Sequence, residues 1–331
     1  MKTRLTELFG LSAPIALAPM ALASGGSLTA ACAKAGALAL LGGGYADLAW
    51  TQREYRLACQ LAANPQPQSR IGCGFISWKL AEDASALDWV LDQALPPRAL
   101  MLSFGDPRPY AKRIAAVDAK LICQVQRLDQ VPLAIEAGAH IIVAQGVEAG
   151  GHGMNALNGR STLTLVPEIA DWLAANTPHT LLLAAGGVAD GRGLAAVLLL
   201  GADGALVGTR LWASQESLGW PGAKELAVTS SGDDTVRSRV FDILRRTNFP
   251  KPYDFRTLRN ALHRQWEERI AELEADPNAA QADYVEGERQ LDFSRMHTTV
   301  GEAVGLVHNL PPASQLIASM NDGATKLLNR C

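Results

Sequence analysis

Short apolar segments recur along the first 210 residues, and helix-like segments separate most of them. Each apolar segment has the length and composition of a strand that is buried on both faces, as in a parallel sheet. The segment IIVA at 141–144 is typical, since it runs directly into a glycine-rich turn. Eight strands are predicted in this way, at residues 15–18, 38–41, 71–76, 99–103, 121–125, 141–144, 181–185 and 205–207.

A glycine stands at the end of several of the predicted helices. Gly36, Gly138 and Gly201 each stand just before a predicted strand, which is how a helix-to-strand turn is commonly closed. Strands that alternate with helices form a parallel sheet, because only parallel neighbours need a helical crossover. Eight such units predict an α/β fold, a closed (β/α)8 TIM barrel. An open doubly wound sheet is the alternative, although no G-x-G-x-x-G follows the first strand.

The chain changes character after the eighth predicted strand. Residues 1–215 are expected to form the barrel, whereas residues 216–295 are charge-rich and helix-prone and predict a smaller helical insertion or second domain. Residues 296–331 are expected to return to the barrel and to end in an amphipathic helix. One face of that helix is predicted to hold Leu316, Met320 and Leu327.

Composition and charge narrow the class of protein. Apolar residues make up 48% and charged residues 19% of the chain, which indicates a compact soluble protein rather than a disordered one. The formal net charge is −3, so nucleic acid and anionic membrane surfaces are not expected partners. The five cysteines are scattered without any C-x-x-C pair, which argues against a zinc site or a disulfide framework and fits a reducing, cytoplasmic location.

The amino terminus resembles a secretory signal only superficially. Lys2 and Arg4 precede an apolar stretch, but Glu7 falls in the would-be basic region. Pro14 and Pro19 then interrupt the apolar part. We therefore expect no signal peptide, and no apolar run approaches the roughly 20 residues of a membrane span.

Two glycine turns follow the seventh and eighth predicted strands, at 185–187 and 207–209. At these adjacent strand ends a barrel commonly holds a phosphate, because bare backbone N–H groups and a helix N-terminus point at it. Asp190 can cap the following helix, and the hydroxyl of Thr209 can donate a further hydrogen bond. The alternative is that the glycines only shorten tight loops.

Backbone-exposing turns also stand at other predicted strand ends. They lie at 18–20, 42–44, 72–74 and 146–151. An extended planar cofactor across a barrel mouth needs close approach of the backbone at several strand ends at once. A generally glycine- and alanine-rich composition is the simpler alternative.

His152 is the candidate catalytic residue, because glycines flank it just beyond the sixth predicted strand, where side chains face a ligand. A neutral imidazole there can act as a general base toward a weakly acidic carbon. Glu148 either orients the loop or points to solvent, and we expect the latter. The arginines of residues 216–295, such as Arg237, Arg239 and Arg245, either lie on solvated helix faces or form internal ion pairs, and we expect the former for most. The other histidines, expected at the surface or in structural roles, are His140, His179, His263, His297 and His308.

Five stretches of the sequence resemble the nitronate monooxygenase family, also known as 2-nitropropane dioxygenases, which are FMN-dependent barrel enzymes. They are PIALAPM at 14–20, LGGGY at 41–45, VAQGVEAGGHG at 143–153, AAGGVADGRG at 184–193 and GADGALVGTRLW at 201–212. The VEAGGH and GGVADGRG blocks are the specific ones. The resemblance covers about the first 210 residues in the family's order.

The resemblance implies that FMN lies over the carboxyl ends of the strands and that His152 is the catalytic base. The phosphate is expected at the glycine turns of the last two strands, and the ring near Met20, Gln145 and Gly150. The implied cofactor-binding residues are Ala18, Pro19, Met20, Gly74, Gln124, Gln145, Gly150, Gly151, Gly186, Gly187, Gly208 and Thr209. No metal is predicted.

Two departures from the family pattern concern the site. Many members carry an asparagine on the third strand where this chain has Gly74, so that any flavin contact is expected through the backbone or is lost. Many also read GGHRG where this chain reads GGHGM, with Gly153 directly after the histidine. The loop beside the base is therefore expected to differ, and with it the substrate specificity.

The reaction implied by the resemblance is oxidation of small alkyl nitronates or nitroalkanes by dioxygen to a carbonyl compound and nitrite. An NAD(P)H-dependent quinone reductase and an FMN-dependent enoyl-acyl-carrier-protein reductase, which has a similar GGH loop, remain alternatives. So does a flavin-binding protein without activity. A reaction like that of inosine-phosphate dehydrogenase would need a cysteine after the sixth strand, and none is present. A homodimer is kept open, since no sequence signal specifies the oligomeric state.

Overall fold

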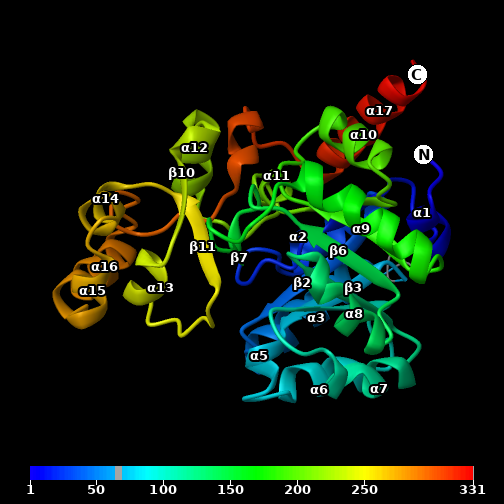
Figure 1. The fold of residues 1–331 in the computed structure, drawn as a ribbon, viewed down its shortest axis with the longest axis horizontal. Helices are drawn as coiled ribbons and strands as arrows, with labels where there is room; N and C mark the ends of the chain where they lie inside the picture. Colours follow the sequence, from blue (N-terminus) through cyan, green and yellow to red (C-terminus); the bar gives the residue numbers. More distant parts are fainter. Residues whose placement is uncertain (64–68, 331) are drawn as a thin grey trace.

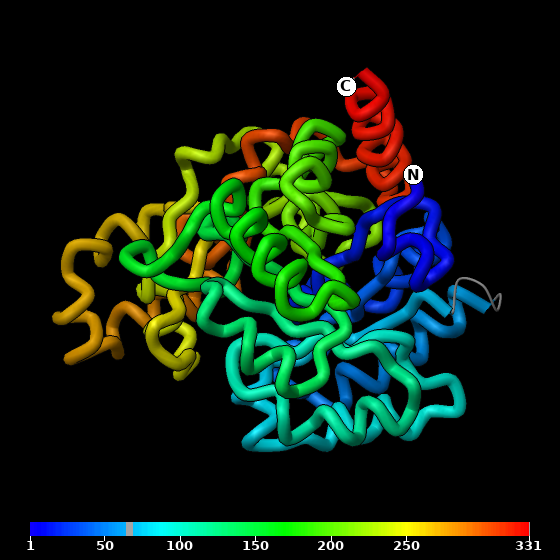
Figure 2. The backbone as a smooth tube through the Cα atoms, turned by 45° about the vertical axis from the view of Figure 1, so that its right-hand side comes forward, coloured from blue at the N-terminus to red at the C-terminus, as the bar shows by residue number. Residues whose placement is uncertain are grey.

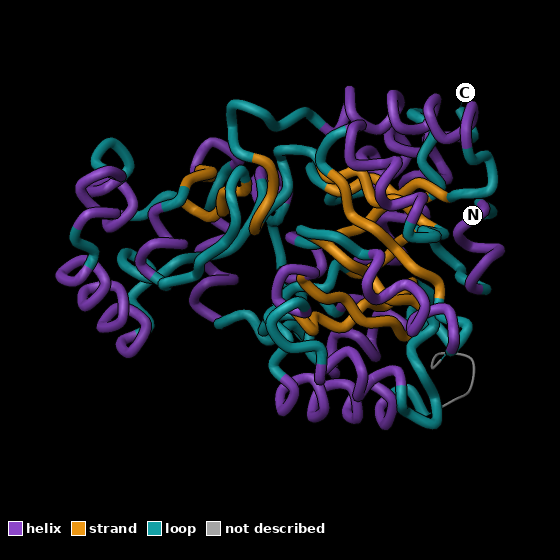
Figure 3. The backbone as a smooth tube through the Cα atoms, turned by 60° about the horizontal axis from the view of Figure 1, so that its bottom comes forward, coloured by secondary structure: helices purple, strands orange, loops and turns teal. Residues whose placement is uncertain are grey.

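Eight parallel strands close into a barrel in the computed structural model, which describes residues 1–63 and 69–330. The last barrel strand pairs with the first, at Ala16 opposite Leu206, so the sheet has no open edge. Figure 3 shows the strands enclosed by helices. The predicted (β/α)8 barrel is confirmed and the open sheet is excluded. The barrel strands are β1 (Ile15–Leu17), β2 (Leu38–Gly44), β3 (Ile71–Ile76), β4 (Ala99–Ser103), β5 (Lys120–Val125), β6 (Ile141–Gln145), β8 (Leu181–Ala185) and β9 (Gly204–Val207).

A layer of helices surrounds the barrel (Figure 1). Most of them connect one strand to the next, as the alternating pattern predicted. None of the described helices is long and apolar enough to cross a membrane. The helices around the barrel are α2 (Gly26–Lys34), α3 (Leu48–Leu61), α5 (Ser77–Leu80), α6 (Ser85–Leu91), α7 (Arg108–Ala116), α8 (Val131–Glu136), α9 (Thr162–Asn176), α10 (Gly191–Leu199) and α11 (Thr209–Trp212).

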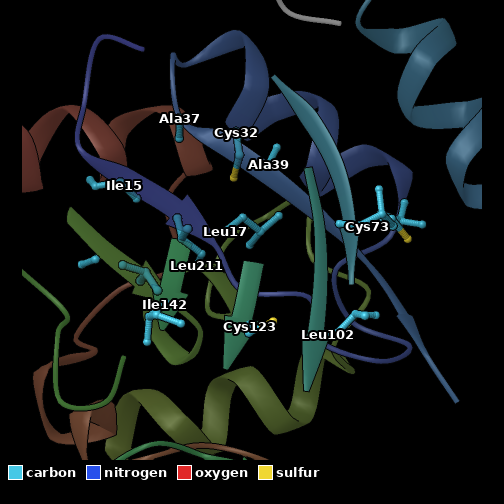
Figure 4. Packing of buried hydrophobic residues seen from close by; sticks show 14 of the residues in the cluster. Ile15, Leu17, Cys32, Ala37, Ala39, Cys73, Leu102, Cys123, Ile142 and Leu211 are labelled. Carbon is cyan, nitrogen blue, oxygen red and sulfur yellow. The ribbon is translucent and has the colours of Figure 1, made fainter. Parts of the chain in front are cut away.

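Alternate residues of each strand enter two different hydrophobic cores. Ile15 and Leu17 of β1 face outward and pack with the surrounding helices, whereas Ala16 between them belongs to the barrel interior. The outward set continues on the neighbouring strands, and Figure 4 shows members of it including Cys73, Leu102 and Ile142. Burial on both faces explains why the strands read as continuous apolar runs.

Helix α1 (Arg4–Phe9) closes the amino-terminal end of the barrel. Its Leu5 and Phe9 belong to the same buried cluster as the barrel interior. Gly204 begins β9, and a Cβ atom there would lie 2.8 Å from Cδ2 of Leu5. The amino-terminal end is therefore filled with side chains, and the carboxyl ends of the strands remain for a ligand.

A three-stranded antiparallel sheet stands beside the carboxyl ends of the barrel strands, in the order β10–β11–β7. The prediction of helices alone for residues 216–295 was wrong, since β10 and β11 lie there. These strands were overlooked because they are short and contain charged residues such as Arg237 and Arg256. The sheet consists of β7 (Gly151–Met154), β10 (Thr235–Ser238) and β11 (Tyr253–Leu258). The other elements are α12 (Pro221–Thr229), η2 (Gly232–Asp234), α13 (Val240–Leu244), α14 (Ala261–Trp266), α15 (Ile270–Ala275), α16 (Asn278–Gln290) and η3 (Glu302–Leu306).

The chain ends with α17 (Ala313–Leu328), which packs against α10 and α2 on the outside of the barrel. Figures 1 and 2 both show it on the opposite side of the barrel from α15 and α16. Leu316 and Met320 are buried and Leu327 packs against the same core, as the apolar face of the sequence predicted.

Candidate active site

A cavity of about 450 Å³ lies at the carboxyl ends of the barrel strands. Its barrel side is formed by the ends of β3, β4, β6 and β8, and its other side by residues such as Phe255 and His297 from the region of the small sheet. His152 and every residue that the sequence predicts to bind the cofactor line this one cavity. They are Ala18, Pro19, Met20, Gly74, Gln124, Gln145, Gly150, Gly151, His152, Gly186, Gly187, Gly208 and Thr209.

The two glycine turns after β8 and β9 stand together at one end of the barrel mouth. Gly186 and Gly187 have φ angles of +108° and +76°, which only glycine adopts readily. As predicted, Asp190 caps α10, since its carboxylate accepts from the backbone N–H groups of Arg192 and Gly193 at 2.9 and 3.1 Å. The start of α10 therefore already has its acceptor.

The glycines of the site differ in what surrounds them. A Cβ atom on Gly187 or Gly208 would meet nothing closer than 3.8 Å, so neither glycine is needed for protein packing. On Gly74, by contrast, it would lie 2.3 Å from Cγ of Pro19, and on Gly150 it would lie 2.5 Å from the backbone nitrogen of Gly301. Gly187 and Gly208, like Gly151 with its nearest atom at 3.8 Å, therefore leave open space for a ligand to approach the backbone.

His152 lies on strand β7 rather than in a flexible loop. It stands opposite Phe255 of β11 in an antiparallel ladder, and Gly151 stands opposite Arg256. The sequence suggested a loop because the four residues of β7 are mostly small or polar and their partner strand is about a hundred residues further along the chain. The backbone of the candidate base is thus fixed by hydrogen bonds.

The imidazole of His152 is held on three sides. The ring of Phe249 stacks on it at a centroid distance of 3.5 Å and an angle of 5°, and that of Phe255 lies 4.6 Å away. Nε2 lies 2.8 Å from Oδ1 of Asp242, on α13. A carboxylate only accepts hydrogen bonds, so Nε2 carries the proton and Nδ1 keeps its lone pair. Within the described part of the chain, Nδ1 has no hydrogen-bond partner.

Burial lowers the pKa of His152 below its usual value of 6.5. Asp242 opposes this effect, because it stabilises the imidazolium, whereas the positive charges of Arg245 and Arg237 add to it. His152 is therefore neutral at physiological pH. A neutral imidazole that is oriented by a carboxylate can accept a proton at Nδ1.

Gln145 connects β6 to the backbone of His152. Its Oε1 accepts from Nε2 of Gln124 and of Gln126, both at 2.9 Å, and its own Nε2 donates to the carbonyl oxygen of His152 at 3.0 Å. These bonds fill both acceptor positions and use one of the two donor hydrogens of the amide. Gln145 thus ties β7 to the barrel and keeps one N–H without a protein acceptor among the described residues.

A sequence profile of the family described as nitronate monooxygenase matches residues 76–323. The chain belongs to this family. The nitronate monooxygenase of Neurospora crassa is 30% identical over 95% of this chain and 89% of its own length. Nitronate monooxygenase npaC of Metarhizium robertsii is 37% identical over 66% of this chain, and the chain spans 62% of that protein. Members of the family are flavin-dependent oxidoreductases.

Solved structures share the whole fold. The FabK structure from Thermotoga maritima is 26% identical, with a TM-score of 0.83 over 100% of this chain and 98% of that one. The nitroalkane oxidase of Streptomyces ansochromogenes has a TM-score of 0.80 over 98% of this chain and 99% of its own, at 24% identity, which indicates the common fold. The similarity includes the region of the small sheet as well as the barrel.

Both departures from the nitronate monooxygenase pattern have a structural counterpart. An asparagine in place of Gly74 would overlap Pro19, so this strand end and the turn after β1 fit each other. The guanidinium of Arg237 lies 3.0 Å from where a Cβ of Gly153 would stand. An arginine from β10 therefore occupies the space beside the residue that follows His152.

Arg237 and Glu148 organise the glycine loop, contrary to the expectation that such side chains point to solvent. The guanidinium of Arg237 donates to the carbonyl oxygens of Val147, Ala149, Gly151 and Asp254 at 2.6–3.2 Å. Burial lowers its pKa to about 9. The carboxylate of Glu148 accepts from the backbone N–H and hydroxyl of Thr162 and from the hydroxyl of Ser161, at the start of α9. The sequence misplaced both side chains because their partners belong to other elements, the glycine loop for Arg237 on β10 and the start of α9 for Glu148.

Sequence reasoning missed Arg245 and His297, which line the cavity from the region of the small sheet, and Asp242, which bonds to the cavity residue His152. His297 was expected to be structural, yet it lines the cavity, and its Nδ1 lies 2.7 Å from the hydroxyl of Tyr284. One signal was present for Asp242. It is the single acidic residue of VFDIL, a segment whose other residues are all apolar.

Proposed function

We propose that this protein uses FMN to oxidise alkyl nitronates with dioxygen to a carbonyl compound and nitrite. The observation that carries the proposal is a cavity that contains two glycine turns and is lined by His152, whose Nε2 lies 2.8 Å from Oδ1 of Asp242. The base suits the removal of a proton from the carbon beside a nitro group. The turns suit the phosphate of a flavin mononucleotide.

The residues of the cavity fit FMN. Gly187 and Gly208 leave room beside their backbone, and Thr209 Oγ1 accepts from the N–H of Gly301 at 2.9 Å, so its own proton is free for a phosphate oxygen. Met20 and Gly150 line the part of the cavity where the ring would lie. When bound, FMN accepts electrons from the substrate and passes them to dioxygen.

The chain contributes a base, its orientation and the exclusion of water. His152 Nδ1 takes the proton from the carbon of a neutral nitroalkane, and Asp242 stabilises the imidazolium that forms. Phe249 and Phe255 stack against the ring and so help to keep water away from it. A substrate that arrives as the nitronate has already lost this proton and needs only to be bound.

The first test is the absorbance spectrum of the purified protein, followed by anaerobic mixing with ethyl nitronate, NADH or NADPH. We expect a flavin spectrum that bleaches with the nitronate and changes little with a nicotinamide. Bleaching by a nicotinamide alone would refute the proposal and favour a quinone or enoyl reductase.

Replacing His152 with alanine tests the role of the base. We expect the variant to stay yellow and to lose turnover of neutral nitroethane. Unchanged turnover would remove the base assignment. A wild-type protein that is yellow but inactive with all of these substrates would indicate a flavin-binding protein without activity.

A further inference from the structure

Arg245 is a cavity residue whose positive charge has no acidic partner among the residues that the structure describes. It follows helix α13 and lines the cavity together with Tyr45 and Phe255. Within residues 1–63 and 69–330 its Nη1 is buried without a hydrogen bond, and it takes part in no ion pair. The neighbouring arginines behave differently, since Arg239 pairs with Glu274 at 3.2 Å and Arg246 bonds to Asn278 at 3.3 Å.

A charged group with a buried, unpaired N–H is costly, so its placement here calls for a ligand or another compensating contact. Arg245 packs against ring faces, with its Cζ 5.0 Å from the ring centre of Phe255 and 6.0 Å from that of Tyr45. Such contacts use the flat face of the guanidinium. Tyr45 is also a hydrogen-bond partner of Arg245, and Nη1 remains as a donor without a partner at the edge. This edge is suited to a planar group with two oxygen atoms.

The position of Arg245 connects it to the candidate base. Phe255 touches both groups, since its ring is also 4.6 Å from that of His152. The charge of Arg245 is felt at both cavity histidines, where it helps to lower the pKa of His152 and of His297. Glu288, an acid in the cavity wall, accepts from the hydroxyl of Tyr284 at 2.6 Å and forms no ion pair with Arg245.

We propose that Arg245 is the residue that binds the two negatively charged oxygens of the nitronate group, and so places the substrate carbon near His152. This inference rests on the proposed function, because it names the part of the substrate that the site recognises. A nitronate is planar and carries its charge on two oxygens, as a carboxylate does. The guanidinium fork matches that geometry, whereas a lysine would offer only a point charge.

The test compares Arg245→Met with Arg246→Met in the flavin-loaded enzyme. Both variants lose one arginine at adjacent positions, but Arg246 is exposed. Nitrate serves as an unreactive planar anion, and its binding is followed by the change in the flavin spectrum and by competition with ethyl nitronate. We expect Arg245→Met to weaken nitrate binding and raise the KM for ethyl nitronate at least about tenfold. Arg246→Met should match the wild type, and flavin content should stay the same in both.

Several results would overturn the assignment. Equal constants in Arg245→Met and Arg246→Met would do so, and so would loss of flavin from Arg245→Met, which would assign the residue to the cofactor. If Arg245→Met does not fold, Arg245→Lys keeps the charge without the fork, and an unchanged KM and nitrate affinity in that variant would refute the proposal.

Failure of this inference can be distinguished from failure of the proposed function. Nitronate turnover that does not depend on Arg245 would leave the function standing and remove the anion site. Nitrate binding that depends on Arg245 in an enzyme without nitronate turnover would keep the anion site and refute the function.

Discussion

Replacement of Asp242 by asparagine tests how the small sheet region supports the base. The side chain keeps its size, and its oxygen can still accept from Nε2 of His152, but the negative charge is lost. His152 and Asp242 have side-chain exposures of 7% and 4%, so water replaces little of the missing interaction. The variant therefore isolates the charge that stabilises a protonated His152.

The magnitude follows from the burial and the 2.8 Å distance between Nε2 of His152 and Oδ1 of Asp242. A hydrogen bond to a charged group contributes about 1.5–3 kcal/mol, and one pKa unit corresponds to about 1.4 kcal/mol. We therefore expect the pKa of His152, which burial already lowers, to fall further when the charge of Asp242 is lost. The rate of proton abstraction should fall by roughly tenfold to 100-fold, since the imidazolium forms in that step.

The assay measures kcat/KM for neutral nitroethane and for ethyl nitronate in parallel. Only nitroethane needs to lose a proton in the active site, so the decrease should appear with nitroethane and be small with the nitronate. Nitroethane deuterated at the reacting carbon should show a larger isotope effect in the variant. Asp254→Asn is the control, because it removes a carboxylate from β11 that forms no hydrogen bond with His152.

An equal decrease with both substrates would refute this reasoning, because it would show that Asp242 supports the site as a whole rather than the proton transfer. Unchanged kinetics with nitroethane would refute it as well. Thermal unfolding and flavin content are needed beside the kinetics, since Oδ2 of Asp242 is buried without a partner among the described residues and an amide nitrogen there lacks an acceptor.

Two further predictions concern stability and cofactor binding. Gly208→Ala should weaken flavin binding with little change in the melting temperature. Gly74→Ala should lower the melting temperature, because its Cβ overlaps protein atoms and that of Gly208→Ala does not. Similar changes in the melting temperature of both variants would contradict this. Burial lowers the pKa of His297 to about 3 in the folded protein, so the unfolded chain takes up the proton first as the pH falls below about 6.5. The free energy of unfolding should therefore fall by about 2 kcal/mol more in wild type than in His297→Gln between about pH 7.5 and about pH 5, as measured by urea unfolding. Parallel curves for the two proteins would show that His297 does not contribute.

The barrel was predictable because its signals are local. Each strand is a run of apolar residues bounded by glycine turns, and three of the eight, β3, β4 and β8, begin and end at the predicted residues. The residues around the mouth were also predictable, since a barrel places the residues that follow its strands at one end. The family resemblance then supplied the chemistry that the pattern alone does not specify.

The small sheet was not predictable, because its strands come from distant parts of the chain. Strand β7 consists of two glycines, a histidine and a methionine, and it becomes a strand only by pairing with β11. Asp242 and Arg245 lie in and just after a short helix between β10 and β11, and their position over the barrel depends on that pairing. Charged residues in a polar segment carry no local sign of burial, which is why the sequence pattern placed Arg237 in solvent.

The pairing of β7 with β11 determines which parts of the chain can be exchanged between relatives. The candidate base His152 belongs by sequence to the barrel, but its backbone is part of a strand in a sheet whose other members come from residues 235–258. A chimera that takes the barrel from one protein and the remainder from another would split this sheet and separate His152 from Asp242. A chimera that keeps the small sheet intact would take residues 147–154 and residues 235–258 from the same protein.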